Sequence, residues 1–370
     1  MGAKSDMTTG IAGQEIRPST ENAATLSNRE LRNRALIRGW LYLVCLMIFA
    51  MVVVGGATRL TESGLSITEW KPIHGVIPPL GEAEWQEEFA KYREIPEYKI
   101  VNNGMSLDEF KFIFWWEWSH RLLGRLIGVV FFVPMVWFWA RGMVEPWLKP
   151  RLVAGFLLGG LQGAVGWWMV ASGLVERTDV SQYRLATHLT LAIVIFAYLF
   201  HLARRLAPGL TTIREAGRHA TLAKLLLVLV IFQIFLGGLV AGLNAGLTFN
   251  TWPLMDGQFV PKGLMAMSPA WANFFENVMT VQFQHRMAAY LVVVVTVWLS
   301  IRVLRDRASS TLHMPAMLLV AAVFLQVMLG IATLLKHVPL DYALGHQAGA
   351  VLLLALAVEM VVRTGARPAA

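Results

Sequence analysis

Four histidines recur in the apolar part of this 370-residue chain, in a pattern that could bind metal. They are His120, His188, His285 and His346, each near the start of an apolar segment. An ionisable side chain inside such a segment is costly, so it marks a functional site. Two histidines at matching depth on parallel helices can face each other across a haem, whose iron accepts one imidazole from each side. This pattern favours two haem sites over zinc, because no carboxylate or thiolate recurs beside the histidines to complete a tetrahedral site.

Small residues follow each histidine one helical turn later. Gly124 follows His120, and Ala192, Ala289 and Ala350 hold the same place after the other three histidines. Small side chains there would leave room for a flat macrocycle. Taken singly, each histidine could instead form a hydrogen bond to a neighbouring helix, but that alternative does not explain why four recur with the same kind of neighbour.

The histidines belong to eight apolar runs that must position them. These runs cover residues 39–58, 126–140, 152–171, 185–203, 222–243, 287–301, 314–335 and 343–362. The chain is 56% hydrophobic and only 15% charged, which argues against an ordinary soluble domain. The runs lack the alternation of barrel strands. We therefore predict an all-α polytopic membrane protein with eight transmembrane helices.

The same motifs occur in the same order in both halves of the chain. Each half has a glycine pair, then His-Arg, then a glutamine and then a histidine. The matched residues are Gly55-Gly56 and Gly237-Gly238, His120-Arg121 and His285-Arg286, Gln162 and Gln326, and His188 and His346. Four spans per half give both halves the same orientation, which predicts a parallel repeat of two four-helix bundles. The glycine pairs alone would also fit ordinary helix packing.

The repeat predicts the domain boundaries. We expect a disordered cytoplasmic tail at 1–38, a first bundle at 39–203 with a large outer loop at 59–111, a linker at 204–221, a second bundle at 222–362 and a tail at 363–370. In the outer loop, Trp85, Phe89 and Tyr92 share one face of a short helix, which suggests that this helix lies on the membrane surface. Ser106 and Glu109 predict a capping box and a helix that starts near Leu107.

The net charge of +8 does not indicate nucleic-acid binding, because the basic residues are distributed by side of the membrane. The short loops at 141–151, 204–224 and 302–307 hold eleven Lys and Arg residues, whereas the short loops on the other side hold four. The positive-inside rule then places both termini in the cytoplasm. The first 38 residues are polar and contain acids, unlike a secretory or mitochondrial signal, so we expect a bacterial inner membrane. The single cysteine, Cys45, excludes an intramolecular disulfide.

The two halves differ beside the first histidine. Glu117 lies three residues before His120, whereas the uncharged Gln282 lies three residues before His285. A carboxylate beside a haem edge could relay a proton or stabilise positive charge on a substrate. The alternative is an ion pair with Arg121 or Arg125. Our hypothesis is that the first half holds a substrate and the second half a fixed cofactor.

Four arginines lie near the histidines and are natural partners for haem propionates. They are Arg59, Arg121, Arg125 and Arg286.

The sequence around these residues closely resembles the haem A synthase family. The resemblance rests on GGATRLTESGLS at 55–66, EWKPIHG at 69–75, EWSHR at 117–121, TWPLMDG at 251–257 and QHR at 284–286, and it extends from about residue 35 to 362. Some bacterial members carry a cysteine pair in the first outer loop. This chain has none there, so it resembles the mitochondrial-type branch.

The resemblance implies an enzyme that oxidises the C8 methyl group of haem O to a formyl group, through an alcohol and a hydrated aldehyde, and so makes haem A for cytochrome c oxidase. It implies that His120 and His188 flank the substrate haem, that Glu117 is the functionally important glutamate, and that His285 and His346 ligate a haem b cofactor. Implied partners are the haem O synthase, the cytochrome c oxidase assembly machinery and an unidentified electron partner, within membrane lipid and without nucleic acid.

Two other functions stay open on the sequence. One is a diheme b-type membrane protein that transfers electrons from quinol, and the other is a non-catalytic haem carrier. Association of the chain with copies of itself also stays open.

Overall fold

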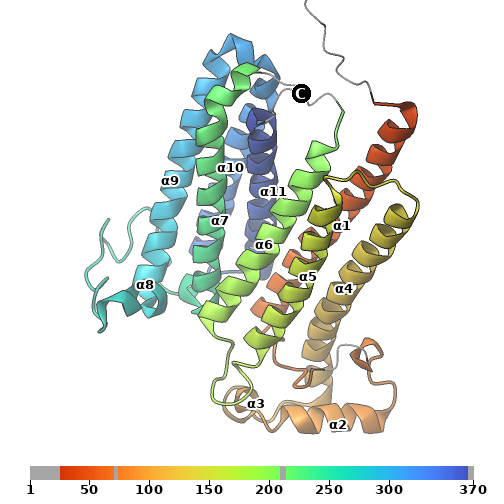
Figure 1. Cartoon of the computed structure of the whole chain (residues 1–370). Coiled ribbons are helices and arrows are strands. Elements are labelled where there is room, and N and C mark those ends of the chain that lie inside the picture. Colours follow the sequence, from red (N-terminus) through yellow and green to blue (C-terminus); the bar gives the residue numbers. More distant parts are fainter. Residues whose placement is uncertain (1–25, 71–73, 209–213, 366–370) are drawn as a thin grey trace, which may run out of the picture.

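Eight helices in this computed structural model are long and apolar enough to cross a membrane, and residues 26–70, 74–208 and 214–365 are described (Figure 1). The spans are α1 (Asn28–Leu60), α4 (Leu107–Ala140), α5 (Lys149–Val170), α6 (Gln182–Arg205), α7 (Ala220–Gly242), α9 (Val278–Arg305), α10 (His313–Leu335) and α11 (Leu340–Gly365). The described ranges contain no β-strand. The prediction of an all-α polytopic membrane protein with eight spanning helices is confirmed.

The spans form two groups of neighbours. In the first group α1 packs against α4 and α6, and α5 packs against the same two helices. In the second group α7 and α10 pack in the same way against α9 and α11. The groups meet through α1, α6, α7 and α11, and their buried apolar side chains form one continuous core.

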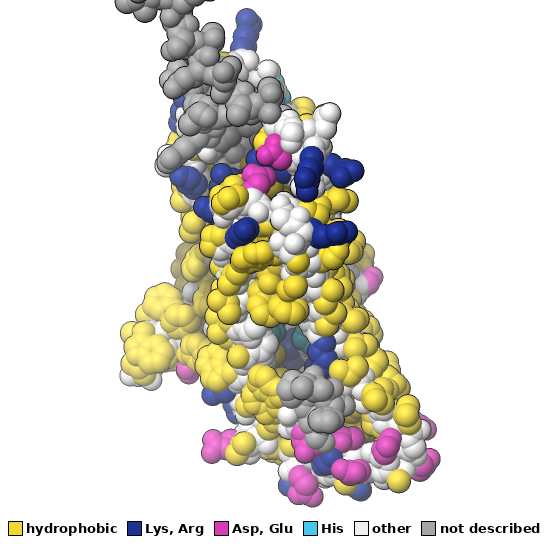
Figure 2. Space-filling view, turned by 45° about the vertical axis from the view of Figure 1, so that its right-hand side comes forward, with side chains coloured by type: hydrophobic (Ala, Val, Ile, Leu, Met, Phe, Trp, Pro, Cys, Tyr) yellow, Lys and Arg dark blue, Asp and Glu magenta, His cyan; other side chains and the backbone are white. Residues whose placement is uncertain are grey.

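The two ends of the molecule differ. We call the end that carries the short helices α2 (Glu82–Tyr92), α3 (Pro96–Ile100) and α8 (Asn273–Glu276) the loop face, and the opposite end, where α1 begins and α11 ends, the terminal face (Figure 1). Lys and Arg side chains gather towards the terminal face, Asp and Glu side chains gather at the loop face, and an apolar belt separates them (Figure 2).

The first span begins earlier than predicted. Ser27 Oγ accepts a hydrogen bond from the Glu30 backbone N–H, and the Glu30 carboxylate accepts one from the Ser27 N–H, which caps α1 at Asn28. Arg34 then forms a bidentate ion pair with Glu145, with nitrogen–oxygen distances of 2.6 and 2.8 Å. The prediction of a disordered tail to residue 38 is therefore wrong for residues 28–38, and residues 1–25 of that tail lie outside the described ranges. At the other terminus, α11 continues to Gly365, past the predicted boundary at 362.

The loop between α1 and α4 packs on protein. The Ser106–Glu109 capping box is confirmed and α4 begins at Leu107 as predicted. However, the apolar face of α2 is buried against the first turns of α4, with ring centroids 5.0 Å apart for both Trp85–Phe114 and Phe89–Phe110. The apolar face of α2 therefore packs on protein, on the aromatic surface that α4 supplies, and the position of α2 at the membrane surface stays a prediction.

Helices α6 and α7 touch backbone to backbone where the two groups meet. A Cβ added at Gly242 would lie 2.6 Å from Gln182 Cα, and one added at Gly238 would lie 2.9 Å from Ala186 Cα. Glycines spaced by four residues allow this close approach in membranes.

We predict that Gly242→Ala lowers thermal stability in detergent, by about 1–3 kcal/mol, because the new methyl group meets backbone that cannot rotate away. The control is Gly160→Ala in α5, where an added Cβ meets nothing within 4 Å. It should leave the unfolding midpoint unchanged or raise it slightly. Heating followed by size-exclusion chromatography measures both, and equal midpoints would contradict the close contact.

Glu97 of α3 is buried at the loop face, where its side chain meets α2. Tyr92 Oη donates a hydrogen bond to Glu97 Oε2 at 3.1 Å, and Asn102 Nδ2 donates to Tyr92 Oη at 2.8 Å. Burial raises the pKa of the Glu97 carboxyl from 4.5 to about 8.

This shift predicts a pH-dependent loop. Between pH 4.5 and 8 the folded loop keeps a proton that the unfolded loop releases, so its stability should be greatest below pH 4.5 and fall as the pH rises to about 8. Hydrogen exchange across residues 82–105 should therefore quicken with rising pH beyond its intrinsic pH dependence. Glu97→Gln should remove the excess, whereas Glu94→Gln, at an exposed carboxylate, should keep it. An excess that survives Glu97→Gln would refute this origin.

Candidate functional site

Each of the four histidines packs its imidazole against a glycine of the preceding spanning helix. A Cβ added at that glycine would lie 3.3 Å from His120 Nε2 at Gly55, 2.9 Å from His188 Cε1 at Gly166, 3.3 Å from His285 Cε1 at Gly237 and 2.7 Å from His346 Cε1 at Gly330. A larger residue would therefore displace the ring or its helix. The contacts join α1 to α4, α5 to α6, α7 to α9 and α10 to α11.

The histidines are divided between the two groups of helices as predicted. His120 on α4 and His188 on α6 belong to the first group, and His285 on α9 and His346 on α11 belong to the second. That the two imidazoles of each group share one site stays a prediction.

Three of the four histidines also meet a glutamine that lies four residues before the glycine. The amide nitrogens of Gln162, Gln233 and Gln326 lie 3.2, 3.1 and 3.1 Å from Nδ1 of His188, His285 and His346. Each amide also donates a hydrogen bond to the backbone carbonyl of the same histidine. Gln162 and Gln326 are the pair that the repeat predicts, whereas Gln233 is a third such glutamine that was not predicted. The signal was present as Gln-x-x-x-Gly in three of the apolar runs.

The amide oxygens of these three glutamines are buried and accept no hydrogen bond from the described residues. An unpaired buried acceptor costs about 1–3 kcal/mol. In each contact the amide nitrogen and not the oxygen faces the ring, so each glutamine donates to its histidine and leaves its own oxygen unpaired.

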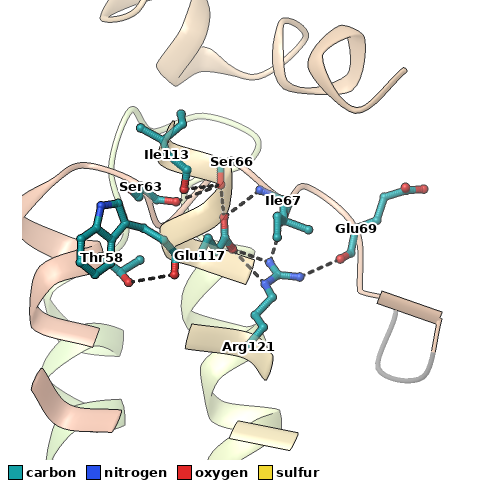
Figure 3. Close-up of polar contacts among 9 residues, drawn as sticks. Thr58, Ser63, Ser66, Ile67, Glu69, Ile113, Glu117 and Arg121 are labelled. Carbon is teal, nitrogen blue, oxygen red and sulfur yellow. Dashed lines mark hydrogen bonds and ion pairs between the residues drawn. The ribbon is translucent and has the colours of Figure 1, made fainter. Parts of the chain in front are cut away.

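Glu117 is buried, and both of its carboxylate oxygens accept hydrogen bonds (Figure 3). Oε2 accepts from Ser66 Oγ and from the Ile67 backbone N–H, both at 2.7 Å. Oε1 accepts from Arg121 Nε at 3.0 Å and from Arg121 Nη2 at 2.6 Å. The ion pair with Arg121, weighed above as the alternative for Glu117, is present, and it ties the chain after α1 to α4.

Arg121 completes this attachment. Its guanidinium donates to the backbone carbonyl of Ile67 at 2.7 Å and to that of Glu69 at 3.0 Å (Figure 3). We call Glu117 and Arg121, with the bound segment 66–69, the first loop anchor.

The second half has a matching anchor, formed by Gln282 and Arg286. Arg286 Nη2 donates to Gln282 Oε1 at 2.8 Å. The two side chains also donate to five backbone carbonyls of the loop after α7, those of Ala245, Thr248, Phe249, Thr251 and Leu254. Two of the carbonyls that Arg286 binds, those of Phe249 and Thr251, lie 12 and 14 residues after Gly237, as those that Arg121 binds lie 12 and 14 residues after Gly55. The anchors are therefore equivalent in position, but only the first contains a carboxylate.

Arg59 joins the two halves at the loop face. Its Nη2 forms an ion pair with Asp179 at 2.7 Å and donates to Asn244 Oδ1 at 3.0 Å and to the Ala241 carbonyl at 3.1 Å. Arg59, Arg121 and Arg286 all bind protein groups, and their role as propionate partners stays a prediction.

We predict that Glu117→Gln loosens the first loop anchor, because the new amide N–H₂ competes with Ile67 N–H or faces the Arg121 guanidinium. Breaking a buried ion pair costs about 3–5 kcal/mol. Hydrogen exchange at the Ile67 amide should therefore quicken markedly. Glu109→Gln, on the same helix, keeps its capping box and should have no effect there. Unchanged protection at Ile67 in Glu117→Gln would contradict the anchor.

The chain is similar to known proteins over most of its length. The family described as "Cytochrome oxidase assembly protein" matches residues 38–358. A heme A synthase of Chelativorans sp. (strain BNC1) is 59% identical over 334 residues, which is 90% of this chain and 92% of that protein. A heme A synthase of Mesorhizobium japonicum is 57% identical over 89% of this chain and 91% of that protein, and one of Rhizobium meliloti is 53% identical over 89% and 90%. The resemblance predicted from the motifs is thereby confirmed, and the chain belongs to this family of cytochrome oxidase assembly proteins, the haem A synthases.

Proposed function

We propose that this protein is a haem A synthase, an oxidoreductase that converts the C8 methyl group of haem O to a formyl group. Family membership over residues 38–358 and the high identity to heme A synthases support this function. The single observation in the structure that carries it is the four histidines, two in each group of helices, each with its ring against a glycine of the preceding span.

The residues present fit a haem in each half. Two imidazoles per half are the donor set that a six-coordinate haem iron takes. The glutamine oxygens beside His188, His285 and His346 are buried polar atoms without a partner among the described residues. We assign His120 and His188 to substrate haem O and His285 and His346 to a haem b cofactor, which when bound would supply electron transfer.

The first half carries the chemistry in this proposal because its anchor alone contains a carboxylate. Glu117 lies one helical turn before His120 on α4, and four hydrogen bonds converge on its two oxygens. A fixed negative charge there would stabilise positive charge that develops on the substrate. Together with Arg121, Glu117 also holds segment 66–69 in place beside the site. Gln282 performs only the second task in the other half.

A hollow opens on the side of the molecule, in the part of the apolar belt nearest the loop face, and histidine surface is visible inside it (Figure 2). We propose that haem O reaches the first half from within the membrane, where its apolar tail is soluble.

We further propose that the two halves form a parallel repeat of four-helix bundles, at 39–203 and 222–362, in a bacterial inner membrane. The matched glycine–imidazole contacts and loop anchors support the repeat. Lys and Arg at the terminal face support cytoplasmic termini (Figure 2). The partners that this function requires are the haem O synthase, cytochrome c oxidase and its assembly machinery, and an electron partner.

The proposed function predicts the haems that copurify with the protein. Extraction from detergent-purified protein, followed by chromatography and mass spectrometry, should find haem B together with haem O, haem A or the hydroxylated intermediate. Haem B alone, at two per chain, would instead favour the diheme electron-transfer protein.

Single histidine variants test the assignment of the halves. His120→Ala and His188→Ala should lose haem O and haem A more than His285→Ala does, and His285→Ala should lose haem B more. His201→Ala, on α6 but outside the paired histidines, should retain both. Equal loss of haem O from the three site variants would contradict the assignment.

A further inference from the structure

The loops that follow the first span of each half differ in charge. Residues 61–106, after α1, contain twelve Asp, Glu, Lys and Arg residues, whereas residues 243–277, after α7, contain three. We call residues 243–277 the second loop. One of its three charged residues, Glu276, accepts a hydrogen bond from Tyr183 Oη of α6 at 2.7 Å. The loop after α1 therefore has the composition of a solvated surface, and the second loop does not.

The second loop exposes large apolar side chains. More than half of the surface is exposed at each of five residues, which are Leu247, Phe259, Val260, Met265 and Trp271. A dense apolar patch of this kind marks a contact with another protein or with a membrane. The position of the loop relative to the spans distinguishes the two.

Part of the second loop lies beside the apolar part of a span. The chain before α8 runs along the loop-face end of α9 (Figure 1). Trp252 Nε1 donates a hydrogen bond to Tyr290 Oη at 3.2 Å. Tyr290 lies twelve residues after the start of α9, which is about 18 Å along the helix. Because Tyr290 belongs to the apolar run 287–301, Trp252 has folded back from the loop face to the edge of the apolar belt.

A groove of about 300 Å³ runs between the second loop and the spans. Leu264, Met265 and Phe274 of the loop line one side, and Phe232 of α7 and Met287 of α9 contribute to the other. Phe232 lies about 15 Å from the loop-face end of α7, and 49% of its surface is exposed outside the helix bundle. The accessible surface of the groove is apolar. An apolar surface at this depth outside the bundle faces hydrocarbon.

Backbone polar groups of the second loop are bound by side chains of the same loop. Asn273 is fully buried, and its amide accepts from the Met267 N–H at 2.9 Å and donates to the carbonyls of Met267 and Ala270 at 2.9 and 3.0 Å. Asn277 Nδ2 donates to the Gly263 carbonyl at 3.0 Å. Irregular backbone near hydrocarbon needs such partners, because no water replaces them there.

We propose that the second loop is a lipid-binding surface, which lies in the bilayer interface and holds an acyl chain of a phospholipid in the groove beside α7 and α9. Trp252 and Trp271 are of the residue type that is enriched at this depth. A protein partner would need polar groups around the groove to fix its orientation, and the accessible surface of the groove offers none. The inference goes beyond the proposed function and does not depend on haem chemistry.

Spin labels test the position of the loop in the full chain. Phe259→Cys and Trp271→Cys, each in a Cys45→Ala background, carry a nitroxide in vesicles of phosphatidylcholine and phosphatidylglycerol. Oxygen, which concentrates in hydrocarbon, should relax both labels more strongly than a water-soluble nickel chelate does. Glu94→Cys, at an exposed position of the charged loop after α1, should show the reverse. Stronger relaxation by nickel at both sites of the second loop would overturn the proposal. Protection from both reagents would also overturn it, because a second copy or another protein would then cover the loop.

Photo-crosslinking tests the groove. A phosphatidylcholine with a diazirine on its acyl chain, added to the same vesicles, should attach to peptides that contain residues 264–274. Met265→Lys places a charge in the groove and should reduce this labelling several-fold. Ala266→Lys makes the same change at an exposed neighbour outside the groove and should leave it unchanged. Equal labelling of the two variants overturns the groove as the acyl-chain site.

Wild-type labelling keeps the proposal testable should Met265→Lys not fold. Labelling of residues 264–274 that is no stronger than that of residues 82–94 would then overturn it. Neither readout requires turnover, so a failure of the proposed function would leave both results unaffected.

Discussion

The packing of an imidazole against a glycine is the contact on which the rest of the site depends. It brings two helices close enough for the glutamine amide of one to bond the histidine carbonyl of the other, in surroundings where no water can replace that bond. The contact occurs four times, always between a histidine helix and the span before it in the chain. Because glycine alone leaves room for the ring, the position of each imidazole is set by backbone and not by a movable side chain.

The loop anchors extend this order beyond the apolar belt. In each half an arginine binds backbone carbonyls of the loop that follows the first span of that half. Arg121 does so one turn after Glu117, and Arg286 does so one turn after Gln282. Equivalent geometry is thus built with a carboxylate in one half and an amide in the other. A protein that used both halves alike would have no need for a carboxylate in only one of them.

The sequence alone was sufficient for the features that follow from local patterns. Eight apolar runs, the capping box at Ser106 and the order of the four histidines each have a direct physical signature in the chain. The repeat of Gln233 also had a signature, but it becomes visible only when the spacing to glycine is compared among the spans.

Other features depended on partners that are distant in the sequence. The apolar face of α2 indicated that this face is buried, but it did not indicate against what. The face packs on Phe110 and Phe114 because the first turns of α4 extend beyond the apolar belt. Likewise, Arg121 and Arg286 bind backbone carbonyls. Because every residue type has a backbone carbonyl, no sequence motif predicts these hydrogen bonds. Residues 28–38 look polar and yet are helical. The ion pair between Arg34 and Glu145 contributes to this order, and it could not be predicted because the two residues are 111 positions apart in the sequence.

The central claim is that the two halves share one architecture but treat haem differently. The second half keeps its haem b bound, whereas the first half binds haem O and releases haem A. An isotope chase tests it most directly: purified protein carrying unlabelled haems is supplied with excess ¹³C-labelled haem O under turnover, and the haems are then extracted and weighed by mass spectrometry. The account predicts label in the haem O and haem A fractions and none in haem B, whose amount per chain stays constant. Both haems retained unchanged through turnover, or both replaced at the same rate, would contradict it.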